Sequence, residues 1–247
     1  MPQVEGQRRA RLNRQRVLQA AVSLADEAGI VELSMRRLAQ ELHVVPMALY
    51  KHVANKEELL DGMVEVVVAE IDPAAAGTDW KNAVRLRVLS ARAVLQRHGW
   101  ARQVLESRIN QTPAVLAYMD SFIAMFLAGG LTADLTHHVM HAMGSRIWGF
   151  TQELFDEPAH GGEAVDASPE AQAAIFQEMA ARYPNILQMA TAASHDEDSV
   201  VGHGCDDQFE FEFALDLLLD GFERLHQQGW TSTQAKKRRQ YIRPDAR

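Results

Sequence analysis

Residues 30–56 read IVELSMRRLAQELHVVPMALYKHVANK and contain two short amphipathic segments joined by a tight connection. Ser34 can cap the first segment as a helix, because its hydroxyl oxygen accepts a hydrogen bond from an unpaired N–H group of the first turn. Pro46 suits the first turn of a second helix, where its missing N–H group costs nothing. Leu49 and Val53 stand four residues apart, so we expect both to face inward. The pattern predicts a helix-turn-helix, whose second helix enters the major groove of DNA.

The outward face of this second helix combines hydrogen-bond donors with small apolar side chains. Met47 and Ala48 are placed for thymine methyl groups, and the donors are placed for phosphates. Arg36, on the first helix, is the candidate for a bidentate pair to guanine. An ordinary helical hairpin is the alternative interpretation, but it does not easily explain an outward tyrosine, lysine and histidine. The residues expected to contact DNA are Arg36, Val45, Pro46, Met47, Ala48, Tyr50, Lys51, His52 and Lys56.

This segment resembles the N-terminal domain of the TetR family of transcriptional repressors. The resemblance implies that the chain binds a double-stranded DNA operator. His43 departs from the family pattern, which usually has glycine in the turn. That turn residue often has a positive φ, which histidine adopts more readily than most other residues. The family pattern appears here as Gly29, Ser34, Arg36 or Arg37, Leu38-Ala39, Leu49-Tyr50-Lys51-His52-Val53, Asn55-Lys56 and Leu59.

Charge is distributed unevenly along the 247 residues, whose formal net charge is -8. Residues 1–56 hold nine basic and five acidic side chains, a net of +4. Residues 57–235 hold 10 and 27, a net of -17, and residues 236–247 hold six and one, a net of +5. This asymmetry is typical of a small DNA-binding head on an acidic body.

The composition favours a cytoplasmic protein without a membrane segment. No apolar run approaches the roughly 20 residues of a membrane span. The basic N-terminus lacks the apolar segment of a secretory signal. The single cysteine, Cys205, excludes an internal disulfide framework and fits a reducing compartment.

Helical periodicity runs along the chain and no alternating strand pattern occurs, so we expect an all-α fold. A three-helix helix-turn-helix domain over 8–56 is joined by a linking helix, 55–71, to a larger helical bundle for ligand binding and dimerisation over 79–228. The segment 112–129 is apolar nearly all round and is expected to be central. The basic tail, 229–247, is expected to be disordered.

The body resembles, more weakly, the tetracycline-repressor-like C-terminal domain. The matching features are Asp79-Trp80, Gly149-Phe150 and the run FEFEFALDLLLDGFE at 209–223. In those relatives, the helix that ends near Gly149 and the last helix pair with their copies in a four-helix interface. The resemblance therefore implies a homodimer, which is also the commonest kind of oligomer. The residues expected in the interface are Leu218, Phe222 and Trp148.

The helices after the linker enclose an effector pocket in these relatives. In this chain, Val104 or Leu105 stands where the tetracycline-binding members carry a magnesium-ligating histidine. The resemblance thus favours a largely apolar small-molecule effector over a tetracycline–magnesium complex, and no cofactor. Methionines can adapt to varied ligand shapes, although any single one of these residues could equally be core. The residues expected to bind the effector are Arg87, Trp100, Met119, Phe122, Ile123, Met140, Met143 and Ile147.

A metal-dependent helical-bundle enzyme is the alternative function, and it would use the cluster His137, His138 and His141. His137 and His141 share a helix face, but the glutamate that follows the first histidine in zincins is absent. No nucleotide loop, nucleophile elbow or catalytic set occurs, so we expect neither an enzyme nor a metal site. A helical scaffold whose basic head binds an acidic protein is a third interpretation.

Overall fold

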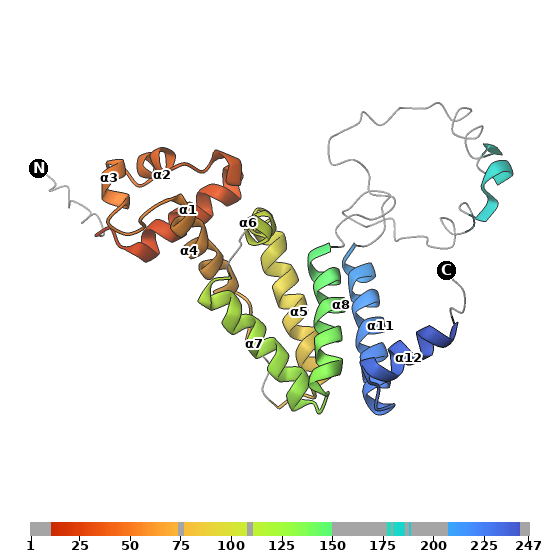
Figure 1. The fold of residues 1–247 in the computed structure, drawn as a ribbon. Helices are drawn as coiled ribbons and strands as arrows, with labels where there is room; N and C mark the ends of the chain where they lie inside the picture. The colour runs from red at the N-terminus through yellow and green to blue at the C-terminus, as the bar shows by residue number, and fades with distance from the viewer. Residues whose placement is uncertain are drawn as a thin grey trace, which may run out of the picture. The chain divides into compact units, whose positions relative to one another are not determined.

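The computed structural model describes residues 11–73, 77–107, 111–149, 177–178, 180–185, 188 and 207–242 (Figure 1). Within these residues every regular element is a helix, which confirms the all-α fold class. Most of the helices belong to one compact unit, residues 1–148 with 222–247, and residues 149–221 form a second unit. Among the described helices, none has both the length and the apolar character that crossing a membrane requires.

The head consists of three helices around a small core. Leu38, Leu49 and Val53 are fully buried in that core, as the spacing of the apolar residues predicts. The Ser34 hydroxyl accepts a hydrogen bond from Arg37 N at 3.2 Å, which confirms the expected cap. The elements are α1 (Arg14–Ala28), the 3-10 turn η1 (Ile30–Glu32), α2 (Met35–Glu41) and α3 (Pro46–Leu49).

The linking helix, α4 (Lys56–Ala69), begins with a reciprocal cap. Asn55 Oδ1 accepts from Glu58 N at 2.8 Å, and Glu58 Oε2 accepts from Ala54 N at 2.7 Å. Two unpaired N–H groups are thereby satisfied where the helix leaves the head. One side of α4 packs on α1, and its buried residues include Leu59, Met63 and Val67.

In the described part of the chain further helices follow, and side-chain caps begin several of them. Asp79, Thr112 and Thr132 each accept a hydrogen bond from the backbone N–H group three residues ahead. These bonds satisfy donors that the first helical turn leaves unpaired. The helices are α5 (Trp80–Arg97), α6 (Ala101–Ser107), α7 (Pro113–Ala128), α8 (Ala133–Gly149), α11 (Asp207–Gln227) and α12 (Ser232–Ile242).

One apolar core joins the head to the first part of the body. Trp100, Ala101 and Val104 of the α6 region are buried in the same cluster as the α1 and α4 side chains. The start of α7 adds Val115 to that cluster. The head is therefore packed against α6 and α7 as well as covalently linked through α4.

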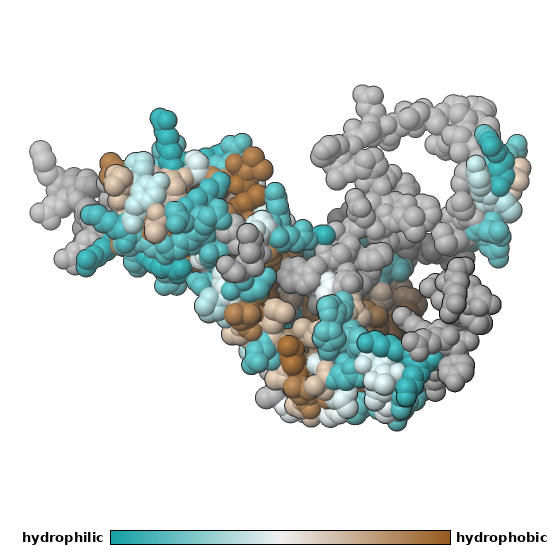
Figure 2. Space-filling model, in the orientation of Figure 1, coloured by the Kyte–Doolittle hydropathy of each residue, from teal (hydrophilic) through white to brown (hydrophobic). Residues whose placement is uncertain are grey.

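Two expectations for the body are wrong. The helix α7 is not buried all round, since Leu116 is 54% exposed and Met119 and Leu127 are also exposed. Figure 2 shows such apolar side chains, in brown, among hydrophilic ones on the visible surface. The basic tail is helical over α12 rather than disordered, because Thr231 begins the helix and Asp134 Oδ2 accepts from Ser232 N at 2.7 Å.

The last long helix, α11, is apolar on two sides. Phe211, Leu215 and Leu219 are buried, whereas Phe209, Phe213 and Leu217 are 61%, 54% and 57% exposed. Each set repeats every four residues, so the two sets follow different faces of the helix. A helix of this kind presents one apolar stripe within its own chain and a second at the surface.

Candidate functional site

The second helix of the helix-turn-helix, α3, and the residues on either side of it expose most of the side chains that the sequence predicts for DNA contact. Met47 is 70% exposed, and Val45, Pro46, Tyr50, Lys51 and Lys56 are exposed as well. Ala48 and His52 are half-buried. Leu49 is fully buried and fixes the helix on the core. The apolar groups therefore lie on the short helix α3, and the hydrogen-bond donors follow it in the turn and at the start of α4, so both lie on one continuous segment, as reading a groove requires.

The two neighbouring arginines of α2 differ in their surroundings. Arg37 Nη1 lies 2.7 Å from Glu32 Oε2 in an ion pair. Arg36 is exposed and pairs with no carboxylate among the described residues. A guanidinium group without an intramolecular partner can offer its paired donors to guanine. This difference supports the choice of Arg36 over Arg37 as the base-contacting residue.

The turn between α2 and α3 has the backbone conformation that the sequence predicts. His43 has a φ of 53°, and no other described non-glycine residue has a positive φ. The turn is closed by hydrogen bonds from His43 N to Gln40 O and from Val44 N to Ala39 O. Histidine is tolerated here because it enters the left-handed region more readily than most residues.

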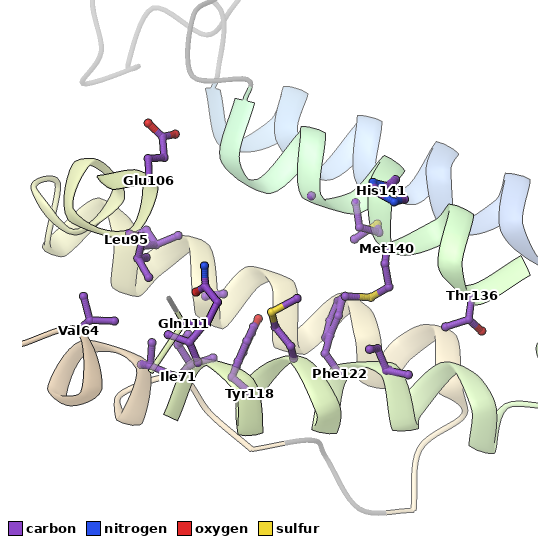
Figure 3. Close-up of a pocket in the computed structure, with 18 of the residues that line it drawn as sticks. Val64, Ile71, Leu95, Glu106, Gln111, Tyr118, Phe122, Thr136, Met140 and His141 are labelled. Carbon is purple, nitrogen blue, oxygen red and sulfur yellow. The ribbon is translucent and has the colours of Figure 1, made fainter. Parts of the chain in front are cut away.

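A cavity of about 640 Å³ opens in the body between α4, α5, α6, α7 and α8 (Figure 3). Its volume is within the range of pockets that bury small molecules. Figure 3 shows Phe122 on α7 facing Met140 on α8 across the cavity. Most of the lining is apolar, and among the described residues Glu106 is the only acidic side chain on it, while no lysine or arginine lines it.

The linking helix forms part of the cavity wall. Val64, Val67 and Val68 of α4 line the cavity together with Ile71, which follows the helix. Ala101 and Leu105 of α6 also line it. Val64, Val67 and Ala101 also belong to the core that holds the head. A molecule in the cavity would therefore touch the same helices that position the DNA-reading face.

Five of the eight predicted effector residues line the cavity, namely Met119, Phe122, Ile123, Met140 and Met143. Arg87 and Trp100 are not among the residues that line it. Arg87 is buried, and its guanidinium group donates to Asp72 O at 2.9 Å and Ser121 Oγ at 3.1 Å. Trp100 is 7% exposed in the shared core. The side chains of Ile147 and Trp148 lie outside the described residues.

The residues predicted for the dimer interface are not the ones that α11 exposes. Phe222 is 7% exposed, so its side chain packs within its own chain and is not available to a partner. Leu218 is half-buried. The exposed stripe of α11 consists of Phe209, Phe213 and Leu217 instead. The helical repeat is the same in both sets, so the sequence alone could not tell which of the two stripes faces inward.

Polar side chains on the cavity wall were missed by the sequence analysis. Figure 3 shows the Tyr118 hydroxyl and the Gln111 amide pointing from the α7 side into the space below α8. Burial raises the pKa of Tyr118 above 10, and nearby Arg87 opposes that rise. The Tyr118 ring stacks on Phe122 at 6.0 Å, and it lies over the Arg87 guanidinium at 4.8 Å. The spacing of Tyr118 four residues before Phe122 was the signal that could have revealed it.

The three histidines of α8 do not converge on one point. His137 and His141 line the cavity, and their rings are 4.7 Å apart. The His138 ring instead contacts the Trp230 ring at 5.3 Å, and its Nε2 lies 3.9 Å from Asp134 Oδ1. Within the described residues, no group of three potential ligands could hold a metal ion. The arrangement gives no geometric support to the alternative of a metal-dependent enzyme.

Comparison with known proteins agrees with this geometry. Residues 17–63 match the bacterial regulatory proteins of the tetR family, and residues 72–226 match the tetracyclin repressor-like C-terminal domain. The transcriptional repressor DrrR1 of Streptomyces coeruleorubidus is 32% identical over 217 residues, which are 85% of this chain and 77% of that protein.

Solved structures show the same fold. Apo ActR from Streptomyces coelicolor has a TM-score of 0.64 and 22% identity, covering 90% of this chain and 99% of its own. ActR in complex with actinorhodin has a TM-score of 0.62 and 24% identity, with coverage of 86% and 96%. BioQ with its double-stranded DNA operator has a TM-score of 0.55 and 21% identity, with coverage of 86% and 98%.

An exposed reading helix on a three-helix head, joined to a helical body with a ligand-sized cavity, defines a helix-turn-helix transcriptional regulator. The chain belongs to the TetR family of such regulators. The family and the relatives found are transcriptional regulators and not enzymes.

Proposed function

We propose that this chain is a cytoplasmic repressor that binds a near-palindromic operator as a homodimer and is released by a small, largely apolar effector. The main support for the proposal is that the helix leading to the head also lines the cavity. The wall of the cavity includes three residues of α4, the helix that leads directly from the DNA-reading domain, and Ile71 just after it. The division into a head over 8–56, a linking helix over 55–71 and a body over 79–228 belongs to the same proposal.

The homodimer is supported by the exposed apolar stripe of α11. Phe209, Phe213 and Leu217 would be costly to leave in water, and a two-fold partner could bury them against its own copy of the stripe. Homodimers are the norm in the family. A two-fold axis through the body would place the two heads on matched half-sites about one helical turn, or a multiple of it, apart.

The nature of the effector is suggested by the charges and polar groups of the cavity. No lysine or arginine is among the described residues that line it, so an anionic effector would lack a counter-charge. Glu106 is already paired with Arg102, whose Nε lies 2.9 Å from Glu106 Oε1. The remaining polar groups, such as those of Tyr118 and Gln111, suit one or two hydrogen bonds to an uncharged molecule. ActR has been solved with actinorhodin, which supports a ligand of small-molecule size.

Release from DNA follows from differential binding. A ligand in the cavity can shift the equilibrium only if it binds the DNA-incompatible arrangement more tightly. Because it touches Val64, Val67 and Ile71, it can displace α4 and thereby change the separation of the two heads. By reciprocity, operator DNA must weaken ligand binding by the same factor.

Selection from a pool of random DNA duplexes would test the proposal. The wild-type chain should enrich a near-palindromic sequence, which should also occur beside its own coding region. The variant Ile123→Trp would fill part of the cavity without touching α3, so it should keep operator affinity while losing response to any inducer. Enrichment of no sequence, or an affinity for the enriched duplex that Lys51→Ala leaves unchanged, would refute the function.

A further inference from the structure

A buried histidine joins the head, the linking helix and the body. His98 ends α5 and its side chain is 5% exposed. Its Nδ1 lies 2.8 Å from Asp26 Oδ1 on α1, and its Nε2 lies 3.2 Å from Glu70 Oε2 at the end of α4. One imidazole ring therefore bridges two acidic side chains that come from different parts of the chain.

Each of these carboxylates is held by a second donor. Trp100 Nε1 donates to Asp26 Oδ1 at 2.6 Å, and Arg97 Nη1 donates to Glu70 Oε2 at 2.6 Å. The carboxylates are thus fixed in place, and they cannot turn away easily if the histidine changes its charge. We call His98, Asp26, Glu70, Arg97 and Trp100 the junction cluster.

The geometry suits only one protonation state of the ring. A neutral imidazole has a single N–H group, so one of its nitrogens would direct a lone pair at a carboxylate oxygen. The imidazolium form has two N–H groups and can donate to Asp26 and Glu70 at once. The positive Arg97 opposes that charge, but it is mostly exposed and is itself paired with Glu70.

Burial, hydrogen bonds and nearby charges together favour the charged form of His98. Burial opposes it, but the hydrogen bonds and negative charges of Asp26 and Glu70 outweigh burial and raise the pKa of His98 above 6.5. A folded-state pKa above the unfolded one means that the contribution to stability is complete below about pH 6.5. That contribution is lost as the pH rises through the folded-state value.

We propose that the proton is a second effector of this regulator, bound at His98, where it locks the DNA-reading head onto the body. Loss of the proton leaves a repulsive contact in the junction cluster and loosens the packing of α1 on the α5–α6 corner. A loosened head must be ordered again when two heads dock on matched half-sites, so it binds the operator more weakly. This last step rests on the repressor function proposed above.

The protonation itself can be tested on the free chain. Nuclear magnetic resonance should show His98 titrating above 6.5, and Asp26→Asn should lower that midpoint by removing one negative partner. The urea midpoint of the wild type should fall between pH 6 and pH 8.5, whereas that of His98→Gln should change less. His138→Gln is the matched control, because His138 lies outside the junction cluster. A His98 midpoint at or below 6.5, or identical pH profiles for the wild type and His98→Gln, would overturn the proposal.

Operator affinity supplies the functional readout. From pH 6 to pH 8.5, wild-type affinity for the selected duplex should fall roughly three- to tenfold more than that of His98→Gln. The histidines of the DNA-reading face, His43 and His52, are present in both proteins and cancel in this comparison. Equal pH profiles with intact DNA binding would overturn the lock alone, whereas absent DNA binding in both proteins would contradict the repressor function instead.

Discussion

Arg36 and Lys51 are both exposed in the head, but their replacement should have different consequences. Lys51→Ala should weaken binding to every duplex alike, because a phosphate contact is present at any sequence. Arg36→Ala should in addition relax the preference at one base pair, by about 1–3 kcal/mol. Affinities for the selected duplex and its single-base variants would separate the two effects. The assignment of Arg36 fails if both variants weaken all duplexes equally.

His43 offers a test of the turn that positions α3. Its φ of 53° costs a side chain-bearing residue about 1–2 kcal/mol, which glycine avoids at a smaller entropic cost. His43→Gly should therefore raise the free energy of unfolding by up to about 1 kcal/mol, as measured by urea denaturation. His43→Val should lower it, since a β-branched residue tolerates this region poorly. A lower stability for the glycine variant would contradict this description of the turn.

Local features were predictable from single residues, whereas long-range partners were not. The caps at Ser34, Asn55 and Asp79 depend on atoms three residues away, so the sequence contains their whole environment. The role of Arg87 depends on Asp72 and Ser121, which are 15 and 34 residues distant. A basic residue on the inner side of a helix could be a ligand partner or a structural donor, and only the packing distinguishes these possibilities.

At the scale of helices, α1 and α4 approach closely at Gly62. A Cβ atom built there would lie 2.6 Å from Leu18 Cδ2 and 2.9 Å from Leu18 Cδ1. Gly62→Ala should therefore lower the free energy of unfolding by about 1–2 kcal/mol, even though alanine favours a helix. Gly221→Ala is the matched control in α11, where nothing lies within 4 Å, and it should raise stability by about 0.5–1 kcal/mol.

Thermal or urea denaturation of these two variants would check the α1–α4 packing. The prediction fails if Gly62→Ala is as stable as Gly221→Ala. In that case Leu18 would have moved aside at no cost, and the packing would be looser than the distances indicate.

The helices themselves could be predicted well, but their burial could not. The apolar content of α7 correctly indicates a helix, yet part of its apolar surface lines a cavity or is exposed. Composition reports how much apolar surface a helix has and not what covers it. Similarly, α12 was expected to be disordered because of its charge. Its contact with Asp134, 98 residues earlier than Ser232, could not be read from local sequence.

The whole molecule should be a dimer whose stability depends on the exposed stripe of α11. Phe213 is 54% exposed in the single chain, so Phe213→Glu should not disturb the fold of the protomer. In the dimer it would bury an unpaired charge, which costs several kcal/mol, about three orders of magnitude in the dissociation constant. Sedimentation should show a folded monomer. Asp220→Glu, on the same helix, is the conservative control, and a dimeric Phe213→Glu protein would refute this interface.

The expected order of the molecule, head then link then body, came from the change of net charge near residue 56 and from the family resemblance. The shape of the cavity could not be predicted from the sequence, because the cavity is formed by helices from five separate stretches of chain. The prediction of five of its lining residues was based on the family resemblance and on the spacing of apolar residues. Its contact with α4, on which the proposed induction depends, became visible only in three dimensions.

The central claim is that the exposed surface formed by α2, α3 and the residues just after α3 binds a specific operator through both phosphates and bases. Its most direct test is the affinity for duplex DNA from beside the chain's own coding region, measured by fluorescence anisotropy over a range of salt concentrations. A scrambled duplex of equal length is the control. We expect affinity for both duplexes to fall steeply as salt rises, because phosphate contacts release counterions. The native duplex should bind at least about a thousandfold more tightly, and equal affinity for the two duplexes at every salt concentration would contradict the claim.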